Sequence, residues 1–297
     1  MECTDVVVIG AGPAGIAAAI QLKRYGISPI LFEKDSSGGL LRNAHLVENY
    51  PGFPNGIGGM QLVRLFEKQL TRHGVMIQYE CVRLLDFRGN QFFIATNERE
   101  IGSRFVIVAS GTIPKQPTDV TIPDSVKSCV FNEVYPIANV QNKKIAIIGA
   151  GDAAFDYALH LSENNSVFIL NRDRDVKCLP LLKERSVRKQ NIIYLQNVRV
   201  KKLNRLKKAI RLYYSGEDLQ EEVEITVDYL LFAVGREPCV DFLTKELIQR
   251  FKQPNLRNCV YFVGDVHNGL YRQTAIAVGE GIKAAMNIYQ DIQNGVQ

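Results

Sequence analysis

The chain reads VVVIGAGPAG at residues 6–15 and IAIIGAGDAA at residues 145–154. Each stretch is an apolar run followed by a glycine turn, which predicts a buried strand, a tight turn and the start of a helix. The first glycine permits the turn, the second lets the backbone approach a pyrophosphate, and the third small residue lets helix and strand pack closely. Free N–H groups at the helix N-terminus attract phosphate. Two such motifs in one chain predict two bound dinucleotides, and FAD with NAD(P)H is the natural pair.

Both turns head the same strand–turn–helix–strand unit, so the chain contains an internal duplication. The second strand is predicted over Pro29–Phe32 in the first unit, where it ends at Glu33, and over Val167–Leu170 in the second, where it ends at Asn171. An acid at this position accepts hydrogen bonds from ribose hydroxyls and repels a 2′-phosphate. Glu33 therefore predicts a ribose contact, whereas Asn171 with Arg172 beside it favours NADPH over NADH.

The remaining segments complete two sheets with helices. A loop rich in glycine and proline at 38–59 precedes a predicted helix over Met60–His73. Strand-like segments follow over Val75–Ala109, and another set lies over Ile192–Leu231. A final amphipathic helix is predicted from Thr274 to about Asp291.

This order predicts an α/β protein of two Rossmann-like, three-layer ββα dinucleotide-binding domains, the second inserted into the first. Prolines at 114, 117 and 123 mark the entry to the insertion. Residues 1–115 with 240–297 are expected to form a discontinuous FAD-binding domain. Residues 116–239 are expected to form the NAD(P)H-binding domain.

Composition is that of a soluble globular protein, with 46% hydrophobic and 23% charged residues. No apolar run is long enough to span a membrane and no signal peptide is visible, so a cytoplasmic location is expected. The net charge is +5, but residues 171–211 carry +11 and the rest of the chain −6. This basic segment suits an acidic partner or a phosphate, or is simply a solvated face. Nucleic acid is not expected as a partner, because no recognised binding motif accompanies the charge.

Several further motifs occur in order along the chain. They are Gly38-Gly39-Leu40, the run VENYPGF at residues 47–53, Ala109-Ser110-Gly111, Gly264-Asp265 and Tyr271-Arg272-Gln273. With the two glycine turns, these residues resemble the thioredoxin reductase family of two-dinucleotide flavoproteins over nearly the whole chain. The resemblance implies a homodimer. It also implies a rotation of the nicotinamide domain about hinges near Ile113–Pro117 and Pro238.

The resemblance and the glycine turns together assign the cofactor contacts. The expected FAD contacts are Gly10, Gly12, Pro13, Ala14, Gly15, Glu33, Lys34, Gly39, Leu40, Asn49, Val82, Ala109, Ser110, Gly111, Gly264, Asp265, Arg272, Gln273 and Thr274. The expected NAD(P) contacts are Gly149, Gly151, Asp152, Ala153, Ala154, Asn171, Arg172, Gly235 and Arg236. No metal site is expected, because neither the cysteines nor the histidines show ligand spacing.

One departure from the family concerns its CxxC pair, which relays electrons from flavin to the thioredoxin disulfide. Here Cys129 stands at the first position of the corresponding region and Asn132 at the second. Asparagine can form neither a disulfide nor a thiolate adduct with flavin, so the standard relay is absent. Cys129 is interpreted as a buried, inert thiol, and no catalytic residue is assigned.

The function expected from these residues is an FAD-dependent NAD(P)H oxidoreductase that passes hydride to FAD and then electrons to an external acceptor. That acceptor is an acidic redox protein (a ferredoxin, a flavodoxin or a thioredoxin-like protein) or a small molecule. Three alternatives stay open: a ferredoxin/flavodoxin–NADP reductase, a disulfide reductase that uses Cys129 with a distant cysteine, and a non-catalytic flavin-binding sensor or partner subunit.

Overall fold

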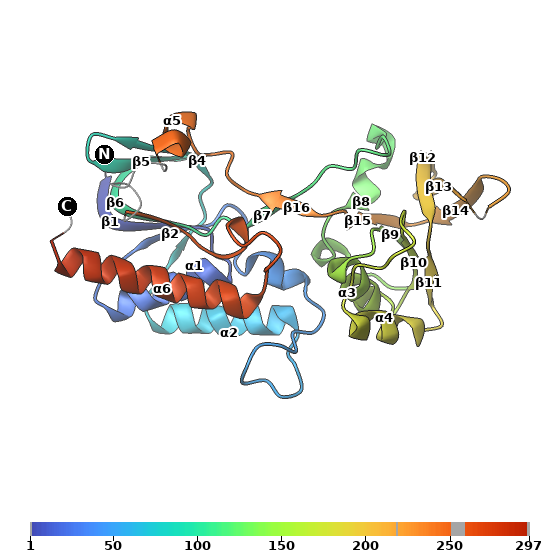
Figure 1. The fold of residues 1–297 in the computed structure, drawn as a ribbon, viewed down its shortest axis with the longest axis horizontal. Helices are drawn as coiled ribbons and strands as arrows, with labels where there is room; N and C mark the ends of the chain where they lie inside the picture. Colours follow the sequence, from blue (N-terminus) through green and yellow to red (C-terminus); the bar gives the residue numbers. More distant parts are fainter. Residues whose placement is uncertain (1, 218, 251–258, 296–297) are drawn as a thin grey trace. The chain divides into compact units, whose positions relative to one another are not determined.

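The computed structural model describes residues 2–217, 219–250 and 259–295, and they divide into two compact units (Figure 1). The first unit comprises Met1–Arg42, Val47–Ile113 and Glu237–Gln297, and the second comprises Asn43–Leu46 and Pro114–Arg236. The second unit thus interrupts the first, as an inserted domain does. No helix among the described residues has both the length and the apolar character needed to cross a membrane.

The first unit is built on one mixed sheet. Its strands are β1 (Glu2–Ile9), β2 (Ile30–Phe32), β3 (Ile77–Gln78), β4 (Val82–Arg88), β5 (Gln91–Thr96), β6 (Glu100–Val108) and β17 (Val260–Phe262). They lie in the order β3-β2-β1-β6-β5-β4, and β17 also pairs with β6. The pairs β1–β2, β2–β3, β1–β6 and β6–β17 are parallel, whereas β4–β5 and β5–β6 are antiparallel. The parallel strands form the sheet of a dinucleotide-binding fold. The antiparallel β4–β5 hairpin joins this sheet through β6 and packs against one of its faces.

Helices cover the face of this sheet away from the β4–β5 hairpin (Figure 1). They are α1 (Pro13–Arg24), α2 (Gly59–Arg72) and α6 (Thr274–Gln293); the short α5 (Lys245–Arg250) lies beside β4. Helices α1 and α6 lie side by side, and a Cβ at Gly281 of α6 would come within 2.1 Å of the Ala14 carbonyl oxygen. Only glycine permits this approach, which fixes α6 against the first glycine turn.

Alternation along the strands divides the core of the first unit. Val7 and Ile9 of β1 belong to a buried cluster with Leu85, Phe92 and Ile94 from the β4–β5 hairpin. Successive side chains of a strand point to opposite faces. The fully buried Val6 and Val8 therefore face the helices. The continuous run of apolar residues in β1 follows from burial on both faces.

The second unit repeats the parallel sheet. Its elements are β8 (Val130–Phe131), β9 (Lys144–Ile148), α3 (Asp152–Leu161), β10 (Ser166–Leu170), α4 (Pro180–Val187), β11 (Ile192–Leu195), β12 (Val198–Leu206), β13 (Ala209–Gly216), β14 (Val223–Val227) and β15 (Tyr229–Phe232). The five-stranded sheet has the order β11-β10-β9-β15-β8, and β12-β13-β14 form a separate antiparallel sheet. Two 3-10 helices, η2 (Asp124–Cys129) and η3 (Tyr135–Ile137), flank β8.

The parallel sheet of the second unit is also buried on both faces. Ile145 and Ile147 pack in one cluster with Phe155 of α3, whereas Ala146 packs in another with Leu203 and Leu212 of the antiparallel sheet. The α3 and α4 helices lie on one side and β12–β14 on the other (Figure 1). This gives the three layers that the sequence predicts.

Two features connect the units along the chain. The crossings after Ile113 and Arg236 lie in β7 (Thr112–Pro114) and β16 (Arg236–Pro238), which pair as a two-stranded ribbon. A second excursion, residues 43–46, leaves the first unit and belongs to the second. The sequence gives no sign of this second excursion.

Candidate functional site

The first glycine turn leaves no room for side chains at two of its positions. Gly10 has φ +104°, and a Cβ there would lie 2.3 Å from the Ala109 carbonyl oxygen. A Cβ at Gly15 would lie 1.9 Å from the carbonyl oxygen of Gly10. A Cβ at Gly12 meets nothing within 4 Å. Gly10 and Gly15 are therefore needed for the turn itself, whereas Gly12 borders open space.

The N-terminus of α1 is exposed to that space. Gly12 is its extended N-cap residue (φ −78°, ψ −177°), and no side chain caps the helix. Uncapped N–H groups at a helix N-terminus bind anions, and Pro13 removes one donor without cost at this position. The first turn therefore fits a pyrophosphate: it offers N–H groups, the positive end of a helix dipole and a glycine face that a Cβ would fill.

The carboxylate of Glu33 lies beside the same turn, just beyond β2. Its Oε2 accepts the N–H of Ala11 at 2.9 Å, and its Oε1 accepts the N–H of Asp35 at 3.1 Å. The side chain is half-buried, and the neighbouring Lys34 is exposed. The two N–H groups hold the carboxylate at the strand end, where a ribose would lie.

Two other expected FAD residues reach this region from distant parts of the sequence, and two more bond to each other. Gly39, in the 3-10 helix η1 (Gly39–Asn43), would place a Cβ 3.4 Å from Cα of Gly12. Gly264, in η5 (Gly264–Val266), would place one 3.0 Å from Cβ of Ala14. Asn49 Nδ2 donates to Oε1 of Gln273 at 2.8 Å.

Most of the predicted set therefore surrounds the N-terminus of α1. Leu40 follows Gly39 in η1, Asp265 follows Gly264 in η5, and Arg272 and Thr274 flank Gln273 at the start of α6. Ala109, Ser110 and Gly111 follow β6, beside the first turn, and Ser110 Oγ donates to the Cys239 carbonyl oxygen at 2.6 Å. Val82 opens β4 and packs against the hairpin core.

The second glycine turn repeats the geometry of the first. Gly149 has φ +127°, and a Cβ there would lie 2.3 Å from the Ala233 carbonyl oxygen. A Cβ at Gly151 meets nothing within 4 Å, and Gly151 is the extended, uncapped N-cap of α3. Ala154 is fully buried, so a methyl group fits at the third position here. This turn also fits a pyrophosphate, for the same reasons.

Two residues that follow Gly151 face away from the sheet. Asp152 and Ala153 are exposed, and Asp152 Oδ1 accepts the N–H of Leu179 at 2.7 Å. Lys177 N–H donates to the Ala150 carbonyl oxygen at 3.2 Å. These contacts hold the 171–179 loop over the second turn.

Asn171 differs from Glu33 although both end the second strand of their unit. Its side chain is directed into the protein, and the residue is 4% exposed. Its Nδ2 donates to the Asp175 carbonyl oxygen at 3.0 Å and to Tyr194 Oη at 2.9 Å, and its Oδ1 accepts the N–H of Asp173. The amide is therefore used to shape the following loop.

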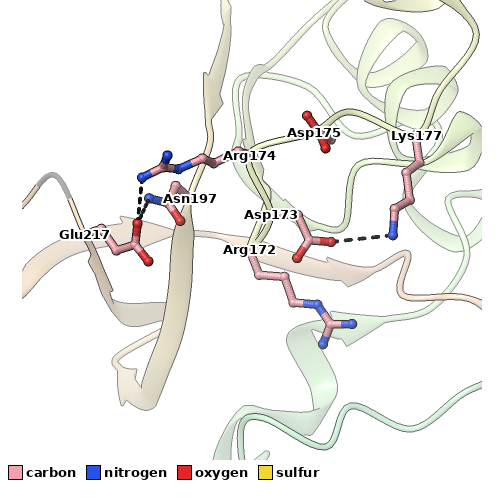
Figure 2. Close-up of a pocket in the computed structure, with 7 residues that line it drawn as sticks. All are labelled: Arg172, Asp173, Arg174, Asp175, Lys177, Asn197 and Glu217. Carbon is pink, nitrogen blue, oxygen red and sulfur yellow. Dashed lines mark hydrogen bonds and ion pairs between the residues drawn. The ribbon is translucent and has the colours of Figure 1, made fainter.

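That loop lines one side of a polar cavity of about 580 Å³ (Figure 2). Its lining residues there are Arg172, Asp173, Arg174, Asp175 and Lys177, and Asn197 and Glu217 complete the cavity. Each basic side chain pairs with an acid: Arg172 with Asp119 at 2.9 Å, Arg174 with Glu217 at 2.9 Å, and Lys177 with Asp173 at 3.7 Å. Two hydrogen bonds lower the pKa of Glu217, a larger effect from Asn197 and a smaller one from Arg174. The cavity is rich in charge but contains as many acids as bases.

The last two expected NAD(P) residues lie at the ribbon. Gly235 has φ +112°, and its carbonyl oxygen accepts the N–H of Lys115 at 3.0 Å. Arg236 Nη2 donates to Oε1 of Glu133 at 3.1 Å, and Asn43 Nδ2 donates to its Oε2 at 3.2 Å. Glu133 follows β8, at the carboxyl edge of the parallel sheet where dinucleotides bind.

Cys129 and Asn132 stand at opposite ends of β8. Cys129 precedes the strand, is 7% exposed and belongs to the buried cluster under the antiparallel sheet. Arg205 Nη1 donates to its Sγ at 3.0 Å. Asn132 follows the strand, at the carboxyl edge of the sheet. The thiol thus lies at the edge away from the second glycine turn.

One polar group was missed by the sequence analysis. Asp156 of α3 accepts the N–H of His45 at 2.9 Å, and the residue forms a further hydrogen bond with the backbone of Leu46. Burial raises its pKa to about 6. The buried Asn43 accepts the N–H of Tyr135 at 3.0 Å. These bonds tie residues 43–46 to the second unit. They join positions about 90 to 110 residues apart, so no local pattern reveals them.

Comparison with known proteins extends this geometry to a family. The model of the pyridine nucleotide-disulphide oxidoreductase family matches residues 4–281. The chain belongs to the pyridine nucleotide-disulphide oxidoreductase family. Within it, the chain is 30% identical to thioredoxin reductase 1, mitochondrial, of Arabidopsis thaliana, over 98% of this chain and 84% of that protein. It is 27% identical to the thioredoxin reductase of Chlamydia trachomatis, over 99% and 100%.

Solved structures agree with the family assignment. The thioredoxin reductase of Lactococcus lactis has a TM-score of 0.87 at 25% identity and covers 98% of this chain and 99% of its own. That of T. acidophilum has a TM-score of 0.85 at 28% identity, over 99% and 100%. The prediction of a thioredoxin reductase-like fold with two Rossmann-like domains is confirmed. So is the prediction of an FAD-dependent NAD(P)H oxidoreductase.

Proposed function

We propose that the chain transfers hydride from NAD(P)H in the second unit to FAD in the first, and that the electrons then leave to an external acceptor without an internal disulfide. The observation that carries this proposal is the pair of uncapped glycine turns. The resemblance, which sets Asn132 at the position of the second relay cysteine, is the reason for proposing no internal disulfide. FAD supplies the electron-accepting chemistry when bound, and NAD(P)H supplies the hydride.

The residues of the first unit bind and orient the flavin cofactor in this proposal. The α1 N-terminus behind Gly12 receives the pyrophosphate, and Glu33 accepts hydrogen bonds from the ribose hydroxyls. Asn49 and Gln273 are hydrogen-bonded to each other and lie along the flavin side. The other residues of the expected set complete the pocket. No general acid or base is required for hydride transfer, so no residue is given that role.

The residues of the second unit bind the nicotinamide cofactor. Gly151 and the α3 N-terminus receive its pyrophosphate, and Arg172 lies where the adenosine 2′ group is read. Gly235 and Arg236 lie where the chain returns to the ribbon. The side chain of Asn171 is turned inward, so its amide shapes the following loop and does not bind the ribose directly.

The position of Cys129 supports an external acceptor. A relay thiol must meet both the flavin and the acceptor, whereas this thiol is buried in a core cluster at the amino edge of the sheet. The strand between Cys129 and Asn132 holds these two positions apart, and a disulfide requires Cα atoms within about 7 Å.

The acceptor itself is part of the proposal. The basic segment 171–211 favours an acidic protein, because complementary charge accelerates encounter. The relatives are named thioredoxin reductases, which favours a second candidate, a thioredoxin-like disulfide protein reduced directly. A small molecule is the third possibility. We further propose a homodimer in the cytoplasm, with no nucleic acid or membrane as partner.

The proposal is tested by anaerobic reduction of the FAD-loaded protein. Addition of NADPH, and separately of NADH, is expected to bleach the flavin absorbance near ~450 nm. Gly151→Val is the variant that blocks the second turn, because its side chain enters the open space next to the α3 N-terminus. It is expected to keep FAD and to slow bleaching at least tenfold. An absence of bleaching with both cofactors in the wild-type protein would contradict the proposal and favour a non-catalytic flavin-binding sensor.

The acceptor is then identified by reoxidation. The reduced protein is mixed with a ferredoxin, a flavodoxin, an oxidised thioredoxin or a quinone, and the return of the flavin absorbance is followed. Faster reoxidation at low than at high salt by an acidic carrier supports docking on the basic segment. Reoxidation by a thioredoxin that is lost in Cys129→Ser would overturn the proposal and establish a relay through Cys129.

A further inference from the structure

We infer that Asp119 is a specificity-determining residue: its carboxylate occupies the guanidinium of Arg172 and thereby limits how far the chain prefers NADPH over NADH. The inference rests on the proposed assignment of the nicotinamide dinucleotide to the second unit. It concerns a residue outside the glycine motif and outside the predicted cofactor set.

Neither of the usual determinants of NADH or NADPH preference, an acid at the strand end or free basic residues beside it, is available in this unit. An acid at the end of the second strand binds the ribose 2′-hydroxyl of NADH, and free basic residues near it bind the 2′-phosphate of NADPH. Here the strand ends at Asn171, whose amide bonds to Asp175 and Tyr194 inside the protein. The bases that follow are present, but each is already paired with a carboxylate.

Arg172 is the residue nearest to the strand end, so its partner matters most. Its Nη1 donates to Asp119 Oδ2 at 2.9 Å, and the two side chains are 59% and 49% exposed. In Figure 2 the Arg172 guanidinium points away from the pairs formed by Arg174 and Lys177. Its partner, Asp119, is not drawn there. Both groups of this pair are thus accessible to a ligand in solution.

Asp119 is ionised whenever a nucleotide binds. The hydrogen bond from Arg172, the largest influence, lowers the pKa of the Asp119 carboxyl below its usual value. A 2′-phosphate carries nearly two negative charges at neutral pH, and it must share Arg172 with a fixed negative charge.

The charges around Arg172 nearly balance, so the Asp119 carboxylate decides their sum. The lining side chains include three bases (Arg172, Arg174 and Lys177) and three acids (Asp173, Asp175 and Glu217), so their formal charges cancel. Asp119 and the nearby Arg199, whose charge also lowers the pKa of the Asp119 carboxyl, keep this sum at zero. Without Asp119, a 2′-phosphate would meet a net positive charge beside Arg172. At separations of about 6–7 Å in water, one charge changes the affinity of a doubly charged group by roughly fivefold.

The test is calorimetric binding of two adenosine fragments to the full-length, FAD-loaded protein. Adenosine 2′,5′-bisphosphate reports the 2′-phosphate, and 5′-AMP lacks it. Asp119→Asn is expected to tighten the bisphosphate about fivefold and to change 5′-AMP less than twofold. The gain is expected to shrink at high salt, because both charges are exposed.

Two further variants keep the result specific. Asp124→Asn removes the same charge from the same segment, where Asp124 pairs only on the surface with Lys127 at 2.6 Å. It is expected to change neither affinity. In an Arg172→Gln background, Asp119→Asn is expected to lose its effect, which isolates the pair as a double-mutant cycle.

Each other result of the binding measurements overturns the inference. Weaker bisphosphate binding in Asp119→Asn would mean that Asp119 orients Arg172 for the phosphate. An equal gain for both fragments, or a gain that persists without Arg172, would mean a general charge effect. If neither fragment binds the wild-type protein, the site assignment is wrong. Failure of flavin reduction with fragment binding intact would remove the proposed hydride transfer and leave this inference standing.

Discussion

The two glycine turns have nearly the same backbone, but the residues that follow their second strands differ. Gly10 and Gly149 both take positive φ, and a Cβ on either would lie 2.3 Å from a carbonyl oxygen of the neighbouring strand end. At the strand ends the likeness stops. Glu33 holds its carboxylate beside the first turn, whereas Asn171 directs its amide into the protein. The two units therefore share the backbone of the glycine turn and differ at the end of the second strand, where we propose that each adenosine is read.

The largest difference between the two turns is expected when the third small residue of each is exchanged. Gly15→Ala places a methyl group 1.9 Å from the Gly10 carbonyl oxygen and is expected to cost about 3 kcal/mol and most of the bound FAD. Ala154→Gly creates no clash and is expected to cost about 1 kcal/mol, mainly through helix propensity. Urea unfolding and the ratio of flavin to protein measure both. Similar costs for the two variants would show that the turns are packed alike.

A smaller difference is expected when the second unit receives an acid at its strand end, as Glu33 provides in the first unit. Asn171→Asp places a carboxylate against the Asp175 carbonyl oxygen, where the amide now donates. The buried position makes this cost about 2–3 kcal/mol of stability. Because the side chain is turned inward, the variant is expected to gain no preference for NADH. Unfolding curves and the ratio of NADH to NADPH turnover decide this, and a stable, NADH-selective variant would contradict it.

A third prediction concerns how the free energy of unfolding depends on pH. It involves Asp156 of the second unit, which is hydrogen-bonded to the backbone of His45 and Leu46. Asp156 has a folded pKa of about 6 against 3.8 as its ordinary value. A carboxyl with a raised folded pKa favours folding below its unfolded pKa and loses that contribution as the pH rises through the folded value. Between pH 4 and pH 8 the wild-type protein is thus expected to lose on the order of 2 kcal/mol relative to Asp156→Asn.

Denaturant unfolding of both proteins across this pH range checks the prediction. The difference in unfolding free energy should change in the direction that favours Asp156→Asn at high pH. A difference that is constant with pH would show that the buried carboxyl titrates normally.

The smallest effects are expected at the two ends of β8. Cys129→Ser is expected to change flavin reduction by less than twofold, because the thiol lies in a core cluster. Asn132→Cys places a second thiol three residues after Cys129, yet three extended residues span about 10 Å, too far for a disulfide between them. Thiol titration should therefore find both sulfurs reduced. A disulfide between these positions in an air-oxidised sample would contradict the described placement of β8.

Local chemistry explains what could be predicted from the sequence. The glycine turns need their residues for steric reasons that act within a few positions. The predicted strand over Val167–Leu170 and the final helix from Thr274 therefore match β10 and α6 closely. The orientation of Asn171 was not predictable, because it depends on Tyr194, a residue of the next strand.

Long-range contacts explain what was missed. Asp156 binds backbone groups of residues 43–46, and Asp119 reaches Arg172 across 53 residues. The sequence shows each as an ordinary acid, one on a helix and one in a loop. Only the fold places them against a backbone N–H and a guanidinium.

We propose that two dinucleotide sites act in one chain with no disulfide between them, and the stoichiometry of flavin reduction distinguishes this from a disulfide relay. FAD takes up two electrons, and a redox-active disulfide takes up two more. Anaerobic titration of the FAD-loaded protein with NADPH is predicted to complete flavin bleaching at about one equivalent per flavin. A requirement for about two equivalents would reveal a hidden disulfide in the electron path and contradict the claim.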